Sequence, residues 1–187
     1  IDGGAFQASG EFTGLAAGDH NISVIDANAC GKDTTITIIE PDEFTFTLDT
    51  VIHNSCYGSD DAAISITITG GTQPYSISWT GPGGFSSTEE DLSNLSAGQY
   101  SLNLTDANNC NVFTLDTTII QPPEIVITPV STSDYNSYGV SCYGATDGFI
   151  EVDVSGGTGN LTLSWEGPGG FASADEDITD LQGGNYT

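Results

Sequence analysis

Positive charge is almost absent from this sequence. Of its 187 residues, 26 are Asp or Glu and one is Lys or Arg, which gives a formal net charge of −25. The single basic residue, Lys32, limits the fold to at most one ion pair of the Lys or Arg type. A surface of this sign repels phosphate, so nucleic acid is excluded as a partner and an anionic membrane surface is disfavoured.

Long apolar runs and helical periodicity are missing as well. No stretch approaches the roughly 18 apolar residues that a membrane helix needs, so membrane insertion is not expected. Hydrophobic residues nevertheless make up 37% of the chain, which separates it from disordered acidic tails. The composition therefore predicts a folded and very acidic protein.

The chain repeats itself with a period of about 80 residues. Matching segments occur at 56–58 and 142–144, at 79–85 and 165–171, and at 26–30 and 106–110. These matches predict the C-terminal half of a first repeat (1–40), a complete middle repeat (41–122) and the N-terminal part of a third repeat (123–187). We expect the array to continue beyond both ends of this segment, with short proline-containing joints between neighbouring repeats.

Apolar residues alternate with Ser and Thr inside each repeat. Two clear examples are the runs 64–68 and 100–104, where Ile or Leu occupies every second position. Such a period of two predicts strands with one buried and one wet face, and Gly-rich turns separate them. Six to seven short strands per repeat predict an all-β fold of tandem immunoglobulin-like antiparallel β-sandwich repeats.

Three aromatic residues are expected to mark the sandwich cores. Trp79 and Trp165 fall on the third strand of their repeats, where such a core often holds its largest side chain. Tyr100 follows a Leu-Ser-Ala-Gly-Gln step that is similar to the corner built around a Tyr in these folds. His20 takes the place of that Tyr in the first repeat.

Taken in order along the chain, these segments resemble a known family. The Cys-Tyr-Gly step, the segment 70–79 (Gly-Gly-Thr-Gln-Pro-Tyr-Ser-Ile-Ser-Trp) and the segment 95–110 are similar to the SprB-type repeat of very large cell-surface adhesins in gliding Bacteroidetes-type bacteria. The resemblance implies export by the type IX secretion system, display at the cell surface or as an extracellular filament, and no catalytic activity. It implies no particular ligand.

The four cysteines favour an oxidising compartment. Cys56 and Cys110 are the only pair within one complete repeat, whereas Cys30 and Cys142 would have partners outside this chain. A Cys56–Cys110 bridge would close a long loop and stabilise the repeat by roughly 3–4 kcal/mol. Because the two residues are expected at opposite poles of a sandwich, a staple between neighbouring repeats and free thiols stay open as alternatives.

Acidic side chains gather in the expected loops. Carboxylate and amide oxygens in loops are the ligands that Ca²⁺ selects. The candidate calcium ligands are Asp60, Asp61, Asp106, Asn108 and Asp147. The alternative is that these residues only solvate the loops, since no EF-hand or nonapeptide calcium repeat is present.

Short Asp-Thr strings recur near the ends of the repeats. They resemble the O-glycosylation signal of Bacteroidetes-type bacteria and would mark Thr34, Thr50 and Thr117. A polar strand edge is the simpler interpretation, because so short a string arises by chance in a Thr-rich chain.

An enzymatic role is not expected. The two histidines and Lys32 are isolated in sequence, and the Glu89/Asp91 carboxylates reappear in the third repeat, which indicates a repeated loop rather than one active site. The sequence therefore predicts a structural repeat segment of a large extracellular adhesin or filament, in contact with neighbouring repeats, with other copies, or with surface glycans or proteins. The alternative is a carbohydrate- or protein-binding module array of a secreted protein. The longer insert before Cys142, with Tyr135 and Tyr138, is the best candidate for a contact specific to one repeat.

Overall fold

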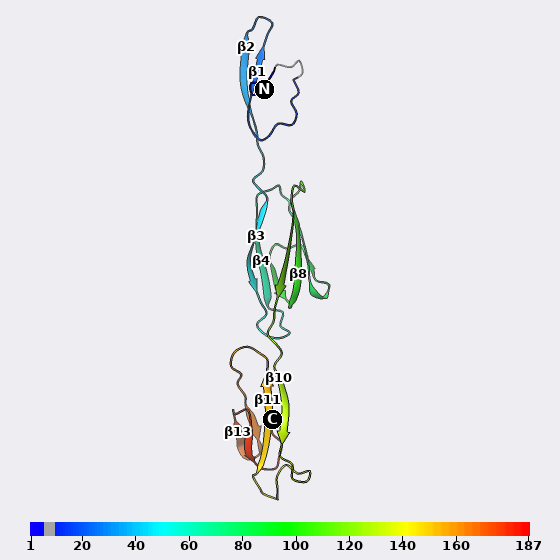
Figure 1. Cartoon of the computed structure of the whole chain (residues 1–187), viewed down its shortest axis with the longest axis vertical. Helices are drawn as coiled ribbons and strands as arrows, with labels where there is room; N and C mark the ends of the chain where they lie inside the picture. Colours follow the sequence, from blue (N-terminus) through cyan, green and yellow to red (C-terminus); the bar gives the residue numbers. More distant parts are fainter. Residues whose placement is uncertain (6–9) are drawn as a thin grey trace. The chain divides into compact units, whose positions relative to one another are not determined.

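The structure is a computed structural model, and it describes residues 1–5 and 10–187. Strands make up nearly all of its regular structure (Figure 1). In chain order they are β1 (Gly18–Ile25), β2 (Gly31–Ile38), β3 (Thr45–Ile52), β4 (Ala62–Thr69), β5 (Ser76–Thr80), β6 (Ser86–Ser87), β7 (Leu92–Leu95), β8 (Gly98–Thr105), β9 (Val112–Ile119), β10 (Val126–Thr132), β11 (Gly148–Ser155), β12 (Trp165–Gly167), β13 (Phe171–Ser173) and β14 (Ile178–Leu181). Two short 3-10 turns, η1 (Pro82–Gly84) and η2 (Pro168–Gly170), interrupt them. The expected all-β class is confirmed.

The sheets repeat their strand order along the chain. Residues of the middle repeat form a three-stranded sheet of order β3-β4-β7 and a four-stranded sheet of order β6-β5-β8-β9. The third repeat reproduces the first of these as β10-β11-β14 and begins the second with β12–β13, while the first repeat contributes the hairpin β1–β2. The described pairings are antiparallel, as in β4–β7 and β11–β14. The tandem antiparallel sandwich predicted from the period-2 pattern is thus what the chain forms.

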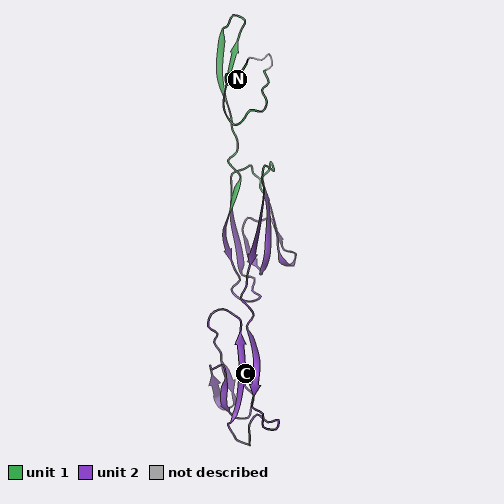
Figure 2. Cartoon of the chain, in the orientation of Figure 1, with its two compact units in different colours: residues 1–47, 68–76, 105–112 green, residues 48–67, 77–104, 113–187 purple. Residues whose placement is uncertain are grey.

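The chain divides into two compact units (Figure 2). One consists of residues 1–47, 68–76 and 105–112, and the other of residues 48–67, 77–104 and 113–187. The first contains the β1–β2 hairpin together with the turns around Gly70 and Asp106. The second contains most of the buried strand residues and all of the third repeat. The repeat boundaries at 40/41 and 122/123 stay predictions.

The buried side chains follow the expected alternation. On β4, Ile64 and Ile66 are buried, and on β8 the same holds for Tyr100 and two leucines. Trp79 on β5 is 0% exposed, whereas Trp165 on β12 is half-buried. Removing these apolar surfaces from water is the main stabilising term, at about 25 cal/mol per Å².

The wet faces use hydroxyl–carboxylate pairs in place of ion pairs. Neighbouring strands are joined by short hydrogen bonds in which a Ser or Thr hydroxyl donates to an acidic side chain, because the sequence has only one Lys or Arg to pair with its 26 Asp and Glu residues. The pairs are Thr37–Asp19 at 2.5 Å, Thr67–Asp49 at 2.7 Å, Ser101–Asp116 at 2.5 Å and Ser131–Glu151. Each pair crosses between strands, so the polar faces also fix strand register.

A Gly-Gly turn closes against the start of the middle and third repeats. The N–H of Gly71 donates to the carbonyl of Asp42 at 2.8 Å, and a Cβ on Gly70 would lie 1.9 Å from the carbonyl oxygen of Glu43. In the third repeat a Cβ on Gly156 would lie 1.7 Å from the Glu124 carbonyl oxygen. Since both Gly70 and Gly156 also have positive φ, only glycine fits there.

Candidate functional site

The expected tyrosine corner is present in the middle and third repeats. The hydroxyl of Tyr100 donates to the carbonyl of Ser96 at 3.1 Å, and that of Tyr186 donates to the carbonyl of Gln182 at 3.0 Å. Each ring also packs edge-on against a phenylalanine that follows the Gly-Pro-Gly-Gly turn, with ring centroids 5.4 Å and 5.3 Å apart. These tyrosines therefore serve the fold and do not form an exposed sugar platform.

The two tryptophans are fixed by the acidic runs that follow them. The Nε1–H of Trp79 donates to the carbonyl of Glu89 at 3.1 Å, and that of Trp165 donates to the carbonyl of Asp175 at 3.0 Å. Asp91 in turn accepts from the hydroxyl of Ser65 at 2.8 Å. The repeated acidic run is thus a structural loop that closes over the core.

Asp61 organises the Cys-Tyr-Gly loop between β3 and β4. Its carboxylate accepts the Ser55 hydroxyl at 2.5 Å, the Ser59 hydroxyl at 2.7 Å and the Ser55 N–H at 3.0 Å. These bonds, the Ser55 and Ser59 hydroxyls first, hold the pKa of Asp61 far below its usual range. Its neighbour Asp60 is exposed.

Asp106 organises the hairpin between β8 and β9. Its carboxylate accepts the N–H of Cys110 at 3.0 Å and that of Thr72 at 3.1 Å, and the Cys110 bond is the main cause of its lowered pKa. The neighbouring Asn108 donates its amide to the Thr72 hydroxyl at 3.1 Å. The structure therefore brings Asp106 and Asn108 together, but around a backbone turn.

Asp147 plays the part of Asp61 in the third repeat. Its carboxylate accepts the N–H of Ser141 at 3.0 Å, and hydrogen bonds from Ser141 lower its pKa. Within residues 1–5 and 10–187, no three His, Cys, Asp or Glu side chains gather in a way that would hold a metal ion. The five proposed calcium ligands thus lie in three separate loops, and Asp61, Asp106 and Asp147 already accept hydrogen bonds within their own loops. Calcium binding stays a prediction.

The four cysteines are free and exposed in the structure. Cys56 lies in the loop that Asp61 organises, where its N–H donates to the Ser59 hydroxyl at 3.2 Å. Cys110 lies in the hairpin that Asp106 organises. The Cys56–Cys110 bridge, and the outside partners of Cys30 and Cys142, stay predictions.

The three candidate glycosylation threonines lie on strands. Thr34 on β2 and Thr50 on β3 are exposed, and Thr117 on β9 is half-buried. The neighbouring Asp116 is engaged with the Ser101 hydroxyl, which is what a polar strand edge requires. Modification at these threonines stays a prediction.

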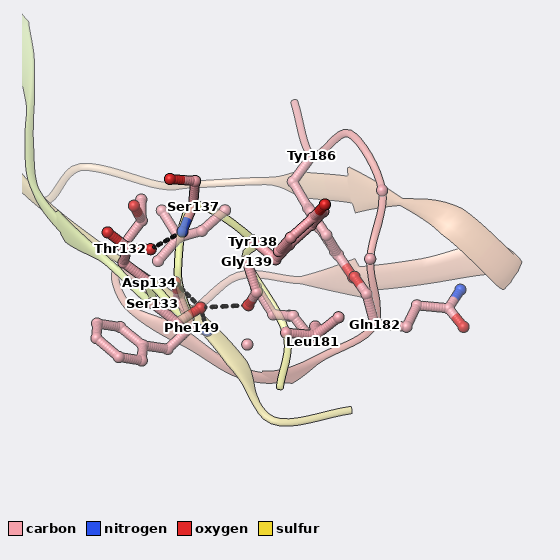
Figure 3. Close-up of a pocket in the computed structure, with 15 residues that line it drawn as sticks. Thr132, Ser133, Asp134, Ser137, Tyr138, Gly139, Phe149, Leu181, Gln182 and Tyr186 are labelled. Carbon is pink, nitrogen blue, oxygen red and sulfur yellow. Dashed lines mark hydrogen bonds between the residues drawn. The ribbon is translucent and has the colours of Figure 1, made fainter. Parts of the chain in front are cut away.

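The insert before Cys142 forms one wall of a cavity in the third repeat (Figure 3). The cavity has a volume of about 390 Å³, and its walls come from residues 132–140, β11 and the segment after β14. Ser133 ties the insert together by donating its hydroxyl to the carbonyl of Gly139 at 2.6 Å. Tyr138 is 73% exposed, and Tyr135 is partly exposed.

In the middle repeat, the position that corresponds to this cavity is occupied by the chain itself. There the N–H of Asn54 donates to the Ile120 carbonyl at 3.1 Å, and its side-chain amide donates to the Leu95 carbonyl at 2.9 Å. Leu95 corresponds to Leu181, which lines the cavity. Because the end of β9 occupies this position in the middle repeat, we assign no ligand to the cavity.

Asn54 is a structural residue that the sequence did not reveal. It is 5% exposed and also donates to the Ser59 carbonyl, so it joins the Cys-Tyr-Gly loop to β7. Its position next to His53 in a polar stretch carries no periodicity that would predict burial.

Comparison with known proteins agrees with these repeated features. The family model of the SprB repeat matches residues 50–84 and 138–170, which cover the Cys-Tyr-Gly loop, the Gly-Gly turn and the tryptophan strand. No curated protein matches the chain. In the described part of the chain, no helix is long and apolar enough to cross a membrane. The SprB-type resemblance seen in the sequence is thus confirmed by family-model matches at two places in the chain, and these matches suggest a repeat segment of a large surface protein.

Proposed function

We propose that this chain is a structural segment of a very large extracellular adhesin or surface filament that mediates attachment, in gliding, cell–cell contact or prey contact. Its sandwiches act as spacers and contact surfaces. The proposal assigns it no catalytic activity and places it outside the cell after export by type IX secretion. Its partners are neighbouring repeats, other copies in a filament, and surface glycans or proteins.

One observation supports this role above the others. The polar side chains that resemble a site are engaged in closing their own loops, and the same arrangement recurs in consecutive repeats. Asp61, Asp106 and Asp147 each accept backbone N–H groups, and Trp79 and Trp165 each bond the carbonyl of a following acidic residue. A scaffold that is repeated with its internal bonds intact fits an array of structural units.

The proposal is tested with antibody fragments raised against residues 41–122. On intact cells these fragments should bind at the surface and reduce attachment, while fragments against a cytoplasmic protein of the same cells should do neither. Absence of binding on intact cells, with binding after lysis, would contradict surface display. Surface binding without any loss of attachment would contradict the adhesive role.

A second candidate is a binding module of a secreted protein, and one observation favours it. The segment before Cys142 is longer than the corresponding segment before Cys56 in the middle repeat, and it presents Tyr138 to solvent. Exposed aromatic side chains are common anchors for glycans and proteins. Glycan-array binding that is lost in Tyr138→Ala but kept in Tyr143→Ala, a second exposed tyrosine, would support this candidate.

A further inference from the structure

The first repeat differs from the other two at the corner that precedes its long strand. Where the others place Tyr100 and Tyr186, it has His20, and where they place Pro82 and Pro168, it has Asp2. In the middle repeat Pro82 packs tightly against Gly98, so that a Cβ on Gly98 would lie 2.3 Å from the proline ring. In the first repeat an imidazole and a carboxylate thus take the places of a phenol ring and a proline ring.

His20 makes the bond that the tyrosines make and adds a second one. Its Nε2 lies 2.8 Å from the carbonyl oxygen of Ala16, the same four-residue step that joins Tyr100 to Ser96. Its Nδ1 lies 2.6 Å from a carboxylate oxygen of Asp2. The ring is held at both nitrogens, and its side chain is only 13% exposed.

Asp2 is itself tied to β1 on its other side. Its second carboxylate oxygen accepts the N–H of Asn21 at 2.7 Å, and its own N–H donates to the Asn21 carbonyl at 2.8 Å. Asp2 therefore connects the segment at residues 1–4 to the strand that carries His20. If the His20 contact were lost, Asp2 would keep its two hydrogen bonds to Asn21.

The number of protons on the ring decides whether both bonds form. The two groups that face the ring, a carbonyl and a carboxylate, are both acceptors. A neutral imidazole has one N–H and can satisfy only one of them, whereas the imidazolium donates to both. Deprotonation therefore removes one bond and places a ring lone pair against an acceptor oxygen.

The charges around the ring also favour the protonated form of His20. Asp2 faces it from the N-terminal segment and Asp19 precedes it on β1, and both favour the imidazolium. On β2 the residue paired with His20 is Ile36, which carries no charge, and Asp19 is bonded to the Thr37 hydroxyl.

We propose that His20 and Asp2 form a pH-dependent clasp that fastens residues 1–4 to β1 and is specific to the first repeat. The clasp is closed when His20 is protonated and Asp2 is ionised. It opens when either condition fails. The middle and third repeats hold the same corner with a tyrosine hydroxyl and have no imidazole there, so the clasp is confined to the first repeat.

The sign of the pH dependence follows from the two groups. The Ala16 carbonyl first and the Asp2 carboxylate second raise the pKa of His20, so its contribution is complete below about pH 6.5 and is lost as the pH rises through the raised value. The His20 bond first and the Asn21 N–H second lower the pKa of Asp2, so its contribution is complete above about pH 3.9 and is lost as the pH falls through the lowered value. The clasp is therefore complete between these limits and opens toward alkaline pH.

The test is a pH titration of the 187-residue chain followed by NMR. The His20 ring signals, assigned with a His53→Gln variant, give its midpoint, and amide hydrogen exchange at Asp2 reports closure of the segment. Asp2→Asn should lower the His20 midpoint by on the order of one pH unit. Asp19→Asn, which removes a nearby carboxylate without a bond to the ring, should lower it less.

The variant His20→Tyr supplies the second readout, because it installs the corner of the other repeats. In the wild type, protection of the Asp2 amide should fall as the pH rises through the His20 midpoint. In His20→Tyr this step should disappear. A His20 midpoint that is the same in Asp2→Asn as in the wild type, or a protection step that persists in His20→Tyr, would overturn the proposal.

Discussion

At the scale of single residues, this chain uses hydrogen bonds to carboxylates and carbonyls where most domains have ion pairs available. Tyr100 and Tyr186 bond the carbonyl four residues earlier, and Asp61 gathers hydroxyl and N–H donors from its own loop. Because the sequence has one Lys or Arg in 187 residues, its specific polar side-chain contacts are mainly hydrogen bonds of this kind and not ion pairs. Their individual strength is modest, so each one is open to a direct mutational test.

Removal of the Tyr100 hydroxyl tests the corner. Tyr100→Phe keeps the ring and deletes the bond to the Ser96 carbonyl, so the free energy of unfolding should fall by about 0.5–1.5 kcal/mol. Urea denaturation of the 187-residue chain measures this. Tyr57→Phe, at a half-exposed tyrosine, is the matched control and should leave stability unchanged. Equal effects of the two variants would contradict the assigned role.

Acid sensitivity tests the Asp61 loop. Because hydrogen bonds from Ser55 and Ser59 lower the pKa of Asp61 in the folded state, the ionised form contributes stability above about pH 3.9, and this is lost as the pH falls through the lowered value. Asp61→Asn should therefore be less stable than the wild type at pH 7, and the difference should shrink toward pH 2. Asp60→Asn is the control, and thermal melting at each pH is the measurement. A difference that is independent of pH would count against this account.

At the scale of secondary-structure elements, alternation and turn chemistry determine the architecture. The strand β4 carries its isoleucines at every second position, and the sequence predicted that strand and its buried face. The Gly-Gly turns were visible as turn signals, but the reason for glycine was not. Glycine is required because the backbone at Glu43 in the middle repeat, and at Glu124 in the third, comes into close contact with the turn in the folded chain.

A pair of glycine substitutions separates backbone strain from this close approach. Gly70 and Gly83 both have positive φ, of 69° and 63°, so alanine at either costs about 1–2 kcal/mol in backbone conformation. Only at Gly70 does the added Cβ meet backbone, 1.9 Å from the Glu43 oxygen. Gly70→Ala should be less stable than Gly83→Ala by a further 1–3 kcal/mol or so. Equal losses in urea denaturation would show that the contact is absent in solution.

Some features of the candidate site were predictable from the sequence and others were not. The repeat follows from the spacing of matching segments, the tryptophan strand from the alternation of apolar residues, and the tyrosine corner from its similarity to the corner of known sandwich folds. The roles of the aspartates do not, because Asp60 and Asp61 are adjacent in sequence and differ only in which one points at the Ser55 and Ser59 donors. The burial of Asn54 was missed for a similar reason, since its partners, Leu95 and Ile120, are distant in sequence.

At the scale of the whole molecule, a net charge of −25 opposes the compact state. Repulsion among carboxylates on a folded chain is screened by salt, with a Debye length of about 10 Å at 0.1 M. The melting temperature should therefore rise as NaCl is increased from about 10 mM to 500 mM. A fall over this range would show that screened attractions dominate instead.

The same experiment separates screening from a calcium site. If screening alone operates, CaCl₂ and MgCl₂ at equal ionic strength raise the melting temperature equally. The sequence-based calcium prediction requires a larger rise with Ca²⁺ that EDTA reverses and that Asp106→Asn removes. A melting temperature that EDTA leaves unchanged contradicts it.

The most direct test of the central claim is electron microscopy of intact cells labelled with an antibody against residues 41–122. A structural segment of a surface adhesin or filament predicts label along threads that extend well beyond the cell envelope. Label confined to compact soluble particles would contradict the filament role and would instead favour the binding modules of a secreted protein.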